Sequence, residues 1–85
     1  MSSTHFTMRL NNFLQARYGA SFAAHFKYEV TSSGPQNLTV WTGTYFIDDI
    51  KYGDGSATNK RDAKEAAAQK TIEMLEAEGN DVPPN

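Results

Sequence analysis

Three cations stand close together where a helix is expected to begin. Lys60, Arg61 and Lys64 follow a glycine-bearing stretch, residues 53–55, and precede an alanine-rich segment. A helix N-terminus carries about half a positive charge from its aligned peptide dipoles, so each cation in the first turn costs roughly 0.3 kcal/mol or more. Free N–H groups and neighbouring cations together form a phosphate site. The cluster therefore predicts an anion-binding site, with a solvated run of charges as the alternative.

The helix that would hold these cations is expected over residues 59–78. Asn59 suits the N-cap position, Asp62 is acidic in the first turn, and Gly79 suits the end of the helix. The residues with the i, i+3, i+4 spacing of a packed stripe are Ala63, Ala66, Ala67, Lys70, Thr71, Met74 and Leu75. The small alanines would let this helix approach a sheet closely.

An amphipathic helix is also expected over residues 6–17. Its apolar side would consist of Phe6, Leu10, Phe13, Leu14 and the stem of Arg17. Its opposite side would consist of Met8, Asn11, Asn12 and Gln15. A solvated side usually holds Glu and Lys, so the uncharged amides favour short-range hydrogen bonding to a ligand. The alternative is a polar surface that binds no ligand.

Three strands are expected between the two helices. Residues 26–32 alternate in the strand manner, residues 38–47 are rich in β-branched and aromatic side chains, and residues 50–53 form a short third strand. Residues 32–37 indicate a loop, and the two aspartates after residue 47 indicate a tight turn, which gives an antiparallel meander. The expected order is therefore α-β-β-β-α, an α+β fold with both helices on one face of the sheet.

Alternation along the second strand divides its side chains between two faces. Trp41 and Tyr45 would face the helices, so packing explains them better than stacking on a single-stranded nucleic acid. Val40 and Phe46 would lie on the opposite face, with threonines between them. An exposed apolar patch there would indicate a protein partner or a homodimer, whereas scattered apolar side chains are normal on monomers.

The composition indicates one small folded domain. The chain has 85 residues, 39% of them hydrophobic, and no cysteine, which excludes a disulfide framework and a thiolate metal site. No apolar run is long enough to span a bilayer and no signal peptide is visible, so we expect no membrane partner and a cytoplasmic or nuclear location. The folded domain is expected over residues 6–78, between flexible segments at residues 1–5 and 79–85.

Residues for catalysis, metal binding or cofactor binding are not expected. His5 and His25 have no regularly spaced carboxylate or second histidine, and a hairpin turn explains Asp48 and Asp49. The glycine-bearing stretch lacks the Gly-Lys-Ser/Thr ending of a Walker loop. We therefore expect a binding protein rather than an enzyme.

The net charge of −2 is unusual for a nucleic-acid binder. The distribution of charge compensates for it, because residues 59–70 carry four cations against two acids. The acids that follow residue 70 are Glu73, Glu76, Glu78 and Asp81. One end of the second helix is therefore expected to be positive and the other negative.

Two segments carry a resemblance to a known family. Residues 34–37, Gly-Pro-Gln-Asn, followed by Trp41, are similar to the Gly-Pro-x-His motif and trailing aromatic residue of the double-stranded RNA-binding domain family. Residues 60–64, Lys-Arg-Asp-Ala-Lys, are similar to that family's Lys-Lys-x-Ala-Lys helix start. The likeness covers residues 6–78. Within it, residues 12–14 and 56–63 resemble the first such domain of the RNA helicase A group.

The resemblance implies three contacts with one face of A-form double-stranded RNA, which is recognised mainly by shape. The first helix and the loop would each meet a minor groove, and the cations would meet the phosphates of the major groove between them. The implied RNA-binding residues are Asn11, Asn12, Gln15, Gly34, Pro35, Gln36, Asn37, Asn59, Lys60, Arg61 and Lys64. Asn37 stands where the family has histidine, so a neutral amide replaces a ring that can carry charge. The alternative is a protein-interaction or dimerisation module of the same fold with weak or no RNA binding.

Overall fold

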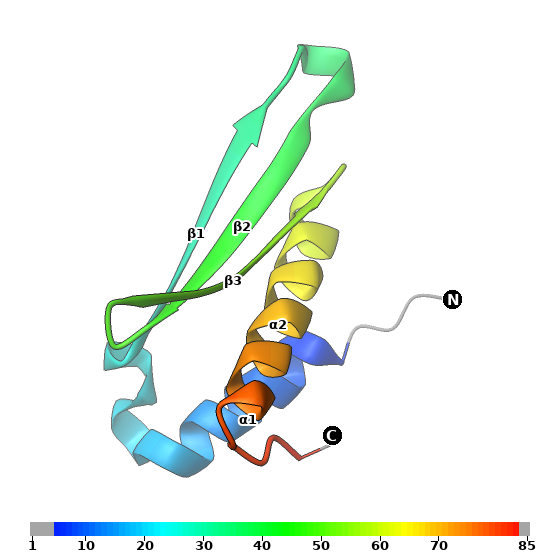
Figure 1. Ribbon diagram of the computed structural model, residues 1–85. Helices are drawn as coiled ribbons and strands as arrows, with labels where there is room; N and C mark the ends of the chain where they lie inside the picture. Colours follow the sequence, from blue (N-terminus) through cyan, green and yellow to red (C-terminus); the bar gives the residue numbers. More distant parts are fainter. Residues whose placement is uncertain (1–4, 84–85) are drawn as a thin grey trace.

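The chain runs from one helix through three strands to a second helix (Figure 1). This computed structural model describes residues 5–83, in which α2 lies along one face of the sheet and α1 packs against α2. The predicted α-β-β-β-α order is confirmed. The elements are α1 (Phe6–Tyr18), β1 (Phe26–Ser33), β2 (Val40–Ile47), β3 (Ile50–Ala57) and α2 (Lys60–Ala77), with short 3₁₀ helices η1 (Gly19–Ala24) and η2 (Gln36–Leu38).

The strands form one antiparallel sheet in the order β1-β2-β3. Asp48 and Asp49 connect β2 to β3 with φ angles of 51° and 66°. A two-residue hairpin turn of type I′ requires positive φ at both central residues, and aspartate tolerates this conformation better than most side chains. The tight turn predicted at these aspartates is confirmed.

The third strand is longer than predicted, because the glycine-bearing stretch continues it to Ala57. A Cβ atom at Gly53 would lie 2.3 Å from the backbone nitrogen of Thr71, and one at Gly55 would lie 2.5 Å from that of Ala67. Both glycines therefore allow α2 to pack directly on the strand. The prediction that the third strand ends at residue 53 is wrong, because Gly53 and Gly55 belong to a longer strand and let α2 pack closely on it.

The core lies between α1, α2 and the sheet. Its buried members are Leu10, Leu14, Tyr45, Ile47, Ala67, Ala68, Ile72, Leu75 and Val82. The buried stripe of α2 is rotated from the predicted one, because Ala68 and Ile72 are buried whereas Lys70 and Met74 are exposed. The helix packs against α1 as well as against β2 and β3, so its buried side faces both.

The segment that follows α2 packs on the domain. Val82 is only 3% exposed, and the Arg9 guanidinium donates hydrogen bonds to the backbone carbonyl oxygens of Val82 and Pro83 at 3.3 and 3.1 Å. The sequence predicts a flexible segment at residues 79–85, and part of that segment is therefore in contact with α1. Of the flexible segment expected at residues 1–5, His5 is the N-cap residue of α1, and residues 1–4 lie outside the described residues, as do residues 84–85. Within residues 5–83, no helix is long and apolar enough to cross a membrane.

Candidate nucleic-acid interface

The cationic cluster lies at the start of α2, as its sequence pattern predicts. The Asn59 side-chain oxygen caps this helix by accepting the backbone N–H of Asp62 at 2.8 Å. The Asn59 amide nitrogen in turn donates to the Asp62 carboxylate at 3.1 Å. The cap fixes where the first turn begins and therefore where Lys60 and Arg61 project, and both of these side chains are exposed.

Two of the cations lie over aromatic rings of the sheet. The Lys60 Nζ is 4.9 Å from the ring centroid of Trp41, and the Lys64 Nζ is 5.3 Å from that of Tyr28. Each such cation–π contact is worth about 0.5–1 kcal/mol at an exposed site. These contacts offset the repulsion between the lysines and the helix dipole, so the cluster needs no bound anion to be stable. They also hold both ammonium groups above the sheet.

Tyr28 and Trp41 are candidate residues that were not among the predicted site residues. The pairing of β1 with β2 places both on the face of the sheet that α2 covers. Trp41 is half-buried beneath Lys60, so packing is the correct interpretation of this residue, but its packing partner is a cation. The alternation of side chains along β1 and β2 could have identified these two residues, because it puts their aromatic rings on the face of the sheet where α2 begins.

The polar side of α1 is presented to solvent. Leu10 and Leu14 are fully buried on the opposite side of the helix. Asn12 and Gln15 are exposed, and Asn11 is half-buried. The remaining member of this side is Met8, which is 50% exposed. The amides predicted from the sequence thus share one accessible surface, together with an apolar side chain that was not among the predicted site residues.

The loop between β1 and β2 has a defined backbone. Gly34 has a φ of 93°, and a Cβ atom there would lie 2.7 Å from the carbonyl oxygen of Leu38, so glycine is required. The Pro35 carbonyl oxygen accepts the backbone N–H of Leu38 at 2.9 Å, which closes the short helix η2 containing Gln36. Asn37 is exposed, and the Leu38 side chain is 69% exposed. The residues predicted for this loop lie together at the tip of the hairpin.

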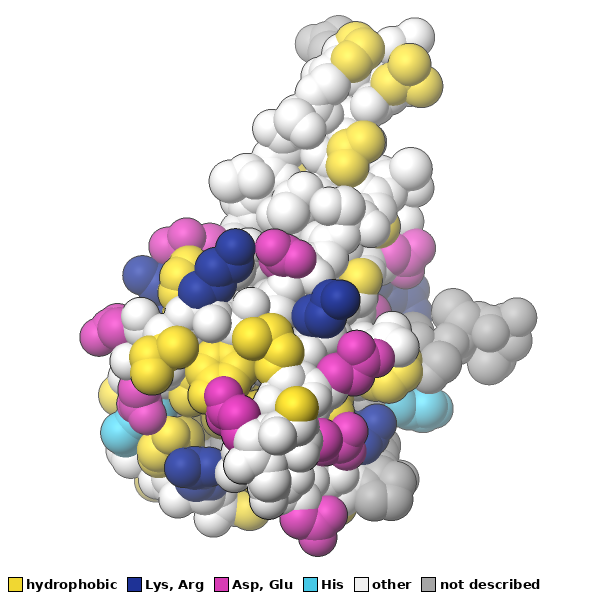
Figure 2. Space-filling model, in the orientation of Figure 1, with side chains coloured by type: hydrophobic (Ala, Val, Ile, Leu, Met, Phe, Trp, Pro, Cys, Tyr) yellow, Lys and Arg dark blue, Asp and Glu magenta, His cyan; other side chains and the backbone are white. Residues whose placement is uncertain are grey.

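The three groups of residues differ in charge. The β1–β2 hairpin projects beyond the rest of the domain, and Figure 2 shows apolar but no charged side chains near its tip. Residues 30–47 contain no Asp, Glu, Lys or Arg. The start of α2 lies between this hairpin and α1 (Figure 1). Of the three groups of candidate residues, only the one at the start of α2 is cationic, whereas the loop residues and the amides of α1 are uncharged.

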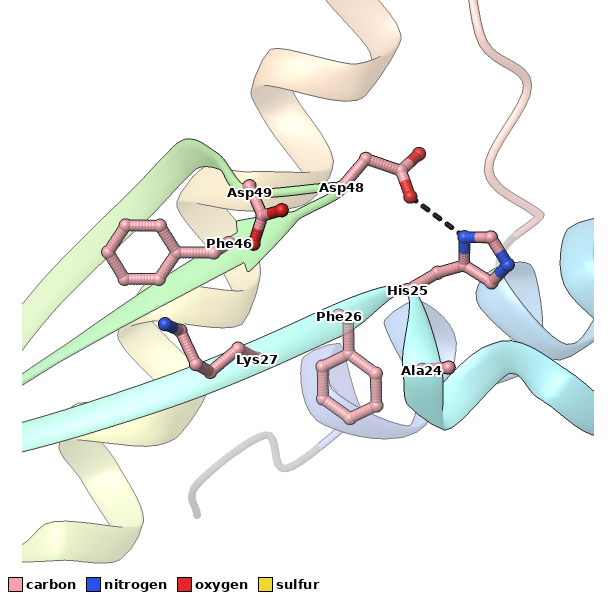
Figure 3. A pocket seen from close by; sticks show the side chains of 7 residues that line it. All are labelled: Ala24, His25, Phe26, Lys27, Phe46, Asp48 and Asp49. Carbon is pink, nitrogen blue, oxygen red and sulfur yellow. Dashed lines mark hydrogen bonds and ion pairs between the residues drawn. The ribbon is translucent and has the colours of Figure 1, made fainter.

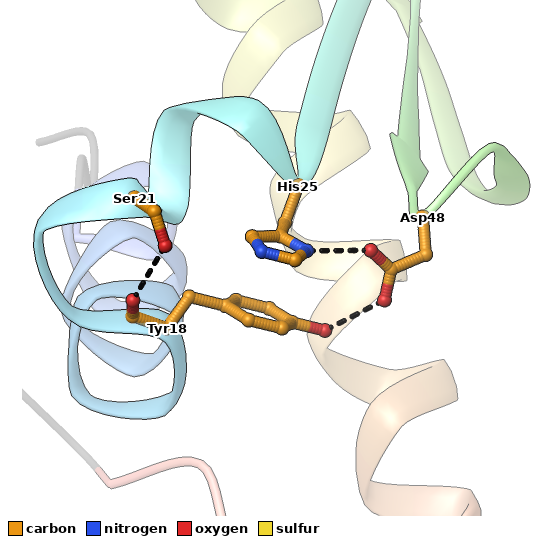
Figure 4. A network of polar contacts seen from close by, with 4 residues as sticks. All are labelled: Tyr18, Ser21, His25 and Asp48. Atoms are coloured by element: carbon orange, nitrogen blue, oxygen red, sulfur yellow. Dashed lines mark hydrogen bonds and ion pairs between the residues drawn. The ribbon is translucent and has the colours of Figure 1, made fainter.

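A separate polar network joins α1, the end of η1 and the β2–β3 turn (Figure 4). The His25 Nδ1 lies 2.8 Å from the Asp48 Oδ1, and the Tyr18 hydroxyl donates to the Asp48 Oδ2 at 2.9 Å. The rings of Tyr18 and His25 stack with their centroids 3.9 Å apart. No carboxylate lies at a regular spacing from His25 in the sequence, and the pair forms because the fold brings distant segments together.

The network borders a pocket of about 300 Å³ (Figure 3). The lining residues are Ala24, His25, Phe26, Lys27, Phe46, Asp48 and Asp49. None of these is a Ser, Thr or Cys nucleophile that the histidine could activate. In the described part of the chain, no group of three or more His, Cys, Asp or Glu side chains could hold a metal ion. We interpret the network as a structural connection between three elements.

The network predicts a stability effect in acid. Hydrogen bonds from His25 and Tyr18 hold the pKa of the Asp48 carboxyl below its usual range. Such a carboxylate stabilises the fold above its unfolded pKa of about 4, and this contribution is lost as the pH falls through the folded pKa. We expect Asp48→Asn, which still suits a left-handed turn, to unfold at lower urea concentration than wild type near neutral pH. The difference should shrink below about pH 4, and a difference independent of pH would contradict this role.

Comparison with known families gives a match over most of the chain. A family model described as the double-stranded RNA binding motif matches residues 7–75, from the first turn of α1 to the last turns of α2. The match includes the whole sheet and all three groups of candidate residues. This family model describes a binding domain rather than a catalytic one. A search of curated proteins found no match to the chain.

Proposed function

Because the chain belongs to the double-stranded RNA binding motif family, we propose that it binds double-stranded RNA by its A-form shape, with little sequence specificity. Family membership supports binding of duplex RNA in general. The observation that carries the finer proposal is the position of the start of α2, which carries Lys60, Arg61 and Lys64 and lies between the hairpin tip and α1 (Figure 1). The proposed partner is therefore a duplex long enough to contact all three regions.

Each region has a role that follows from its chemistry. The cations at the start of α2 would contact phosphates across the major groove and supply most of the salt dependence. The amides of α1 would contact 2′-hydroxyls and base edges in one minor groove, and the loop would enter the next. A-form RNA hides its base edges in a deep, narrow major groove, so these contacts would read shape rather than sequence.

The loop amide predicts a selective effect on RNA. Asn37→Ala removes an exposed side chain that can both donate to and accept from a 2′-hydroxyl. We expect the preference for an RNA duplex over a DNA duplex of the same sequence to fall roughly fivefold, about the value of one hydrogen bond, without a change in salt dependence. Gln69→Ala removes an exposed amide elsewhere on α2 and serves as the control. Equal losses on both duplexes would contradict the assignment of Asn37.

The alternative function, a protein-interaction surface on the open face of the sheet, has less support. Phe46 is half-buried, and the Lys27 Nζ lies 5.2 Å from its ring centroid. Val40 is 39% exposed at the other end of β2, and Thr42 and Thr44 lie between the two apolar residues. The two apolar side chains are therefore separated by polar ones and form no continuous patch.

Residues 12–14 and 56–63 resemble the first domain of the RNA helicase A group, and we propose a relationship to that group within the family. We further propose that the chain sequesters duplex RNA or presents it to an attached or recruited enzyme, in the cytoplasm or the nucleus. No catalytic step is assigned to its own residues.

The proposed surface can be mapped by NMR. A ¹⁵N-labelled chain would be titrated with a short RNA duplex, and the chemical shifts of its amides followed. We expect changes to concentrate in three places, the exposed side of α1, residues 34–38 and the first turns of α2. Changes confined to the open face of the sheet would instead support the protein-interaction alternative and count against the proposed RNA surface.

A further inference from the structure

The first turn of α1 is capped by a residue of α2. The Glu65 Oε1 accepts the backbone N–H of Phe6 at 3.0 Å and that of Thr7 at 3.3 Å. The first N–H groups of a helix have no partner within the helix and need one from elsewhere. His5 occupies the N-cap position of α1 and makes no capping hydrogen bond with its side chain. The carboxylate of Glu65, 58 residues after Thr7 in the sequence, therefore replaces a local N-cap side chain.

The same carboxylate also compensates the positive end of the α1 helix dipole. The first turn of α1 contains no acidic residue. A negative charge at this end is stabilising, and Glu65 supplies it from the neighbouring helix. Because both of its hydrogen bonds go to backbone atoms, they fix the start of α1 and not merely one side chain. Glu65 is therefore one of the contacts that fix the position of α1 along α2.

Glu65 is adjacent to one of the proposed phosphate-binding cations. Lys64 lies over the Tyr28 ring, whose centroid is 4.9 Å from that of Tyr45. Tyr45 is fully buried, and burial, followed by the proximity of Tyr28 and Glu65, raises the pKa of its hydroxyl well above its usual range. Two consecutive residues in the second turn of α2 thus hold different parts of the domain, one the sheet and the other α1.

We propose that Glu65 is a positioning residue for duplex RNA, which sets the place of α1 relative to the cations at the start of α2. This inference rests on the proposed function. The grooves of an A-form duplex have a fixed spacing, so α1 and the cations can bind together only if the distance between them matches it. Glu65 makes no contact with RNA in this account. Its loss would leave the phosphate contacts intact and weaken those that distinguish RNA from DNA.

The test compares Glu65→Ala and Glu65→Gln with a matched control, Glu73→Ala, which removes an exposed carboxylate from the same helix. Binding to RNA and DNA duplexes of one sequence would be measured over a range of salt concentrations. We expect Glu65→Ala to lose about tenfold of its preference for RNA, the value of one or two hydrogen bonds, with an unchanged salt slope. Glu65→Gln keeps an acceptor oxygen without the charge and should lie between Glu65→Ala and wild type. The control should keep the full preference.

Hydrogen exchange without RNA provides the second measurement. We expect the backbone amides of Phe6 and Thr7 to exchange faster in both Glu65 variants than in the wild-type chain. If Glu65→Ala folds poorly, Glu65→Gln alone provides this comparison. Unchanged RNA preference in the Glu65 variants would overturn the inference while leaving the proposed function intact. A loss of RNA preference accompanied by a flatter salt slope would also overturn it, because the phosphate contacts would then have changed as well. Absence of RNA binding by the wild-type chain would overturn the proposed function and this inference together.

Discussion

Replacing Lys60, Arg61 and Lys64 together by alanine is expected to weaken binding to every RNA duplex alike, by roughly 100-fold at about 0.15 M salt. Each phosphate contact releases counterions, so the slope of log K against log salt should flatten by up to about three units. The affinities of the wild-type chain and the variant should converge as the salt concentration rises. The loss is uniform because phosphates carry no sequence information.

The control for this experiment is a second triple variant with the same change in net charge. Lys27, Lys51 and Lys70 are exposed lysines outside the cluster, and replacing them by alanine also moves the net charge from −2 to −5. We expect this variant to keep nearly the full salt slope. Equal losses in the two triple variants would mean that overall charge, rather than the placement of cations at the start of α2, governs binding.

Gly53→Ala is expected to destabilise the fold by about 3 kcal/mol or more, a shift of the melting temperature of roughly 12 °C or more. The added Cβ would lie 2.3 Å from the Thr71 backbone nitrogen and 2.7 Å from the carbonyl carbon of Lys70. Backbone atoms of a packed helix cannot move aside as a flexible side chain can. The change would also disturb the hydrogen bond from the Gly53 N–H to the Thr71 Oγ1, which is 3.0 Å long and buried.

Thermal unfolding followed by circular dichroism would measure this effect. Asp54→Ala is the matched control, because Asp54 is the next residue of β3, is exposed, and makes only a surface ion pair with Lys51 at 3.6 Å. Such pairs are worth about 0–1 kcal/mol, so the control should melt within a few degrees of wild type. If Gly53→Ala were as stable as the control, the close packing of α2 on β3 would not be what requires glycine there.

Local signals were sufficient to predict most of the architecture. Asn59 and Gly79 bracket α2, because a capping side chain and a residue that tolerates positive φ act within one turn of the helix. The paired aspartates predicted the β2–β3 turn for a similarly local reason. The cationic cluster was also predicted correctly as the opening of a helix, since its position depends only on the cap that precedes it.

Features that depend on contacts between distant segments could not be predicted in the same way. Gly53 and Gly55 look like loop residues until α2 is placed on them, and only then does the lack of a side chain acquire its meaning. Glu65 looks like one more exposed acid of a helix, although it caps α1. Val82 lies where composition indicates a flexible end, yet it is buried in the core. In each case the deciding partner is far away in the sequence.

The most direct test of the central claim is the binding of the intact chain to an RNA duplex of roughly 20 bp, with a DNA duplex of the same sequence as control. The titration would be made at low salt and again at about 0.15 M salt. We expect RNA to bind more tightly than DNA at both concentrations, and both affinities to fall as salt rises. Absence of RNA binding even at low salt, or equal binding to the two duplexes, would contradict recognition of A-form RNA by this domain.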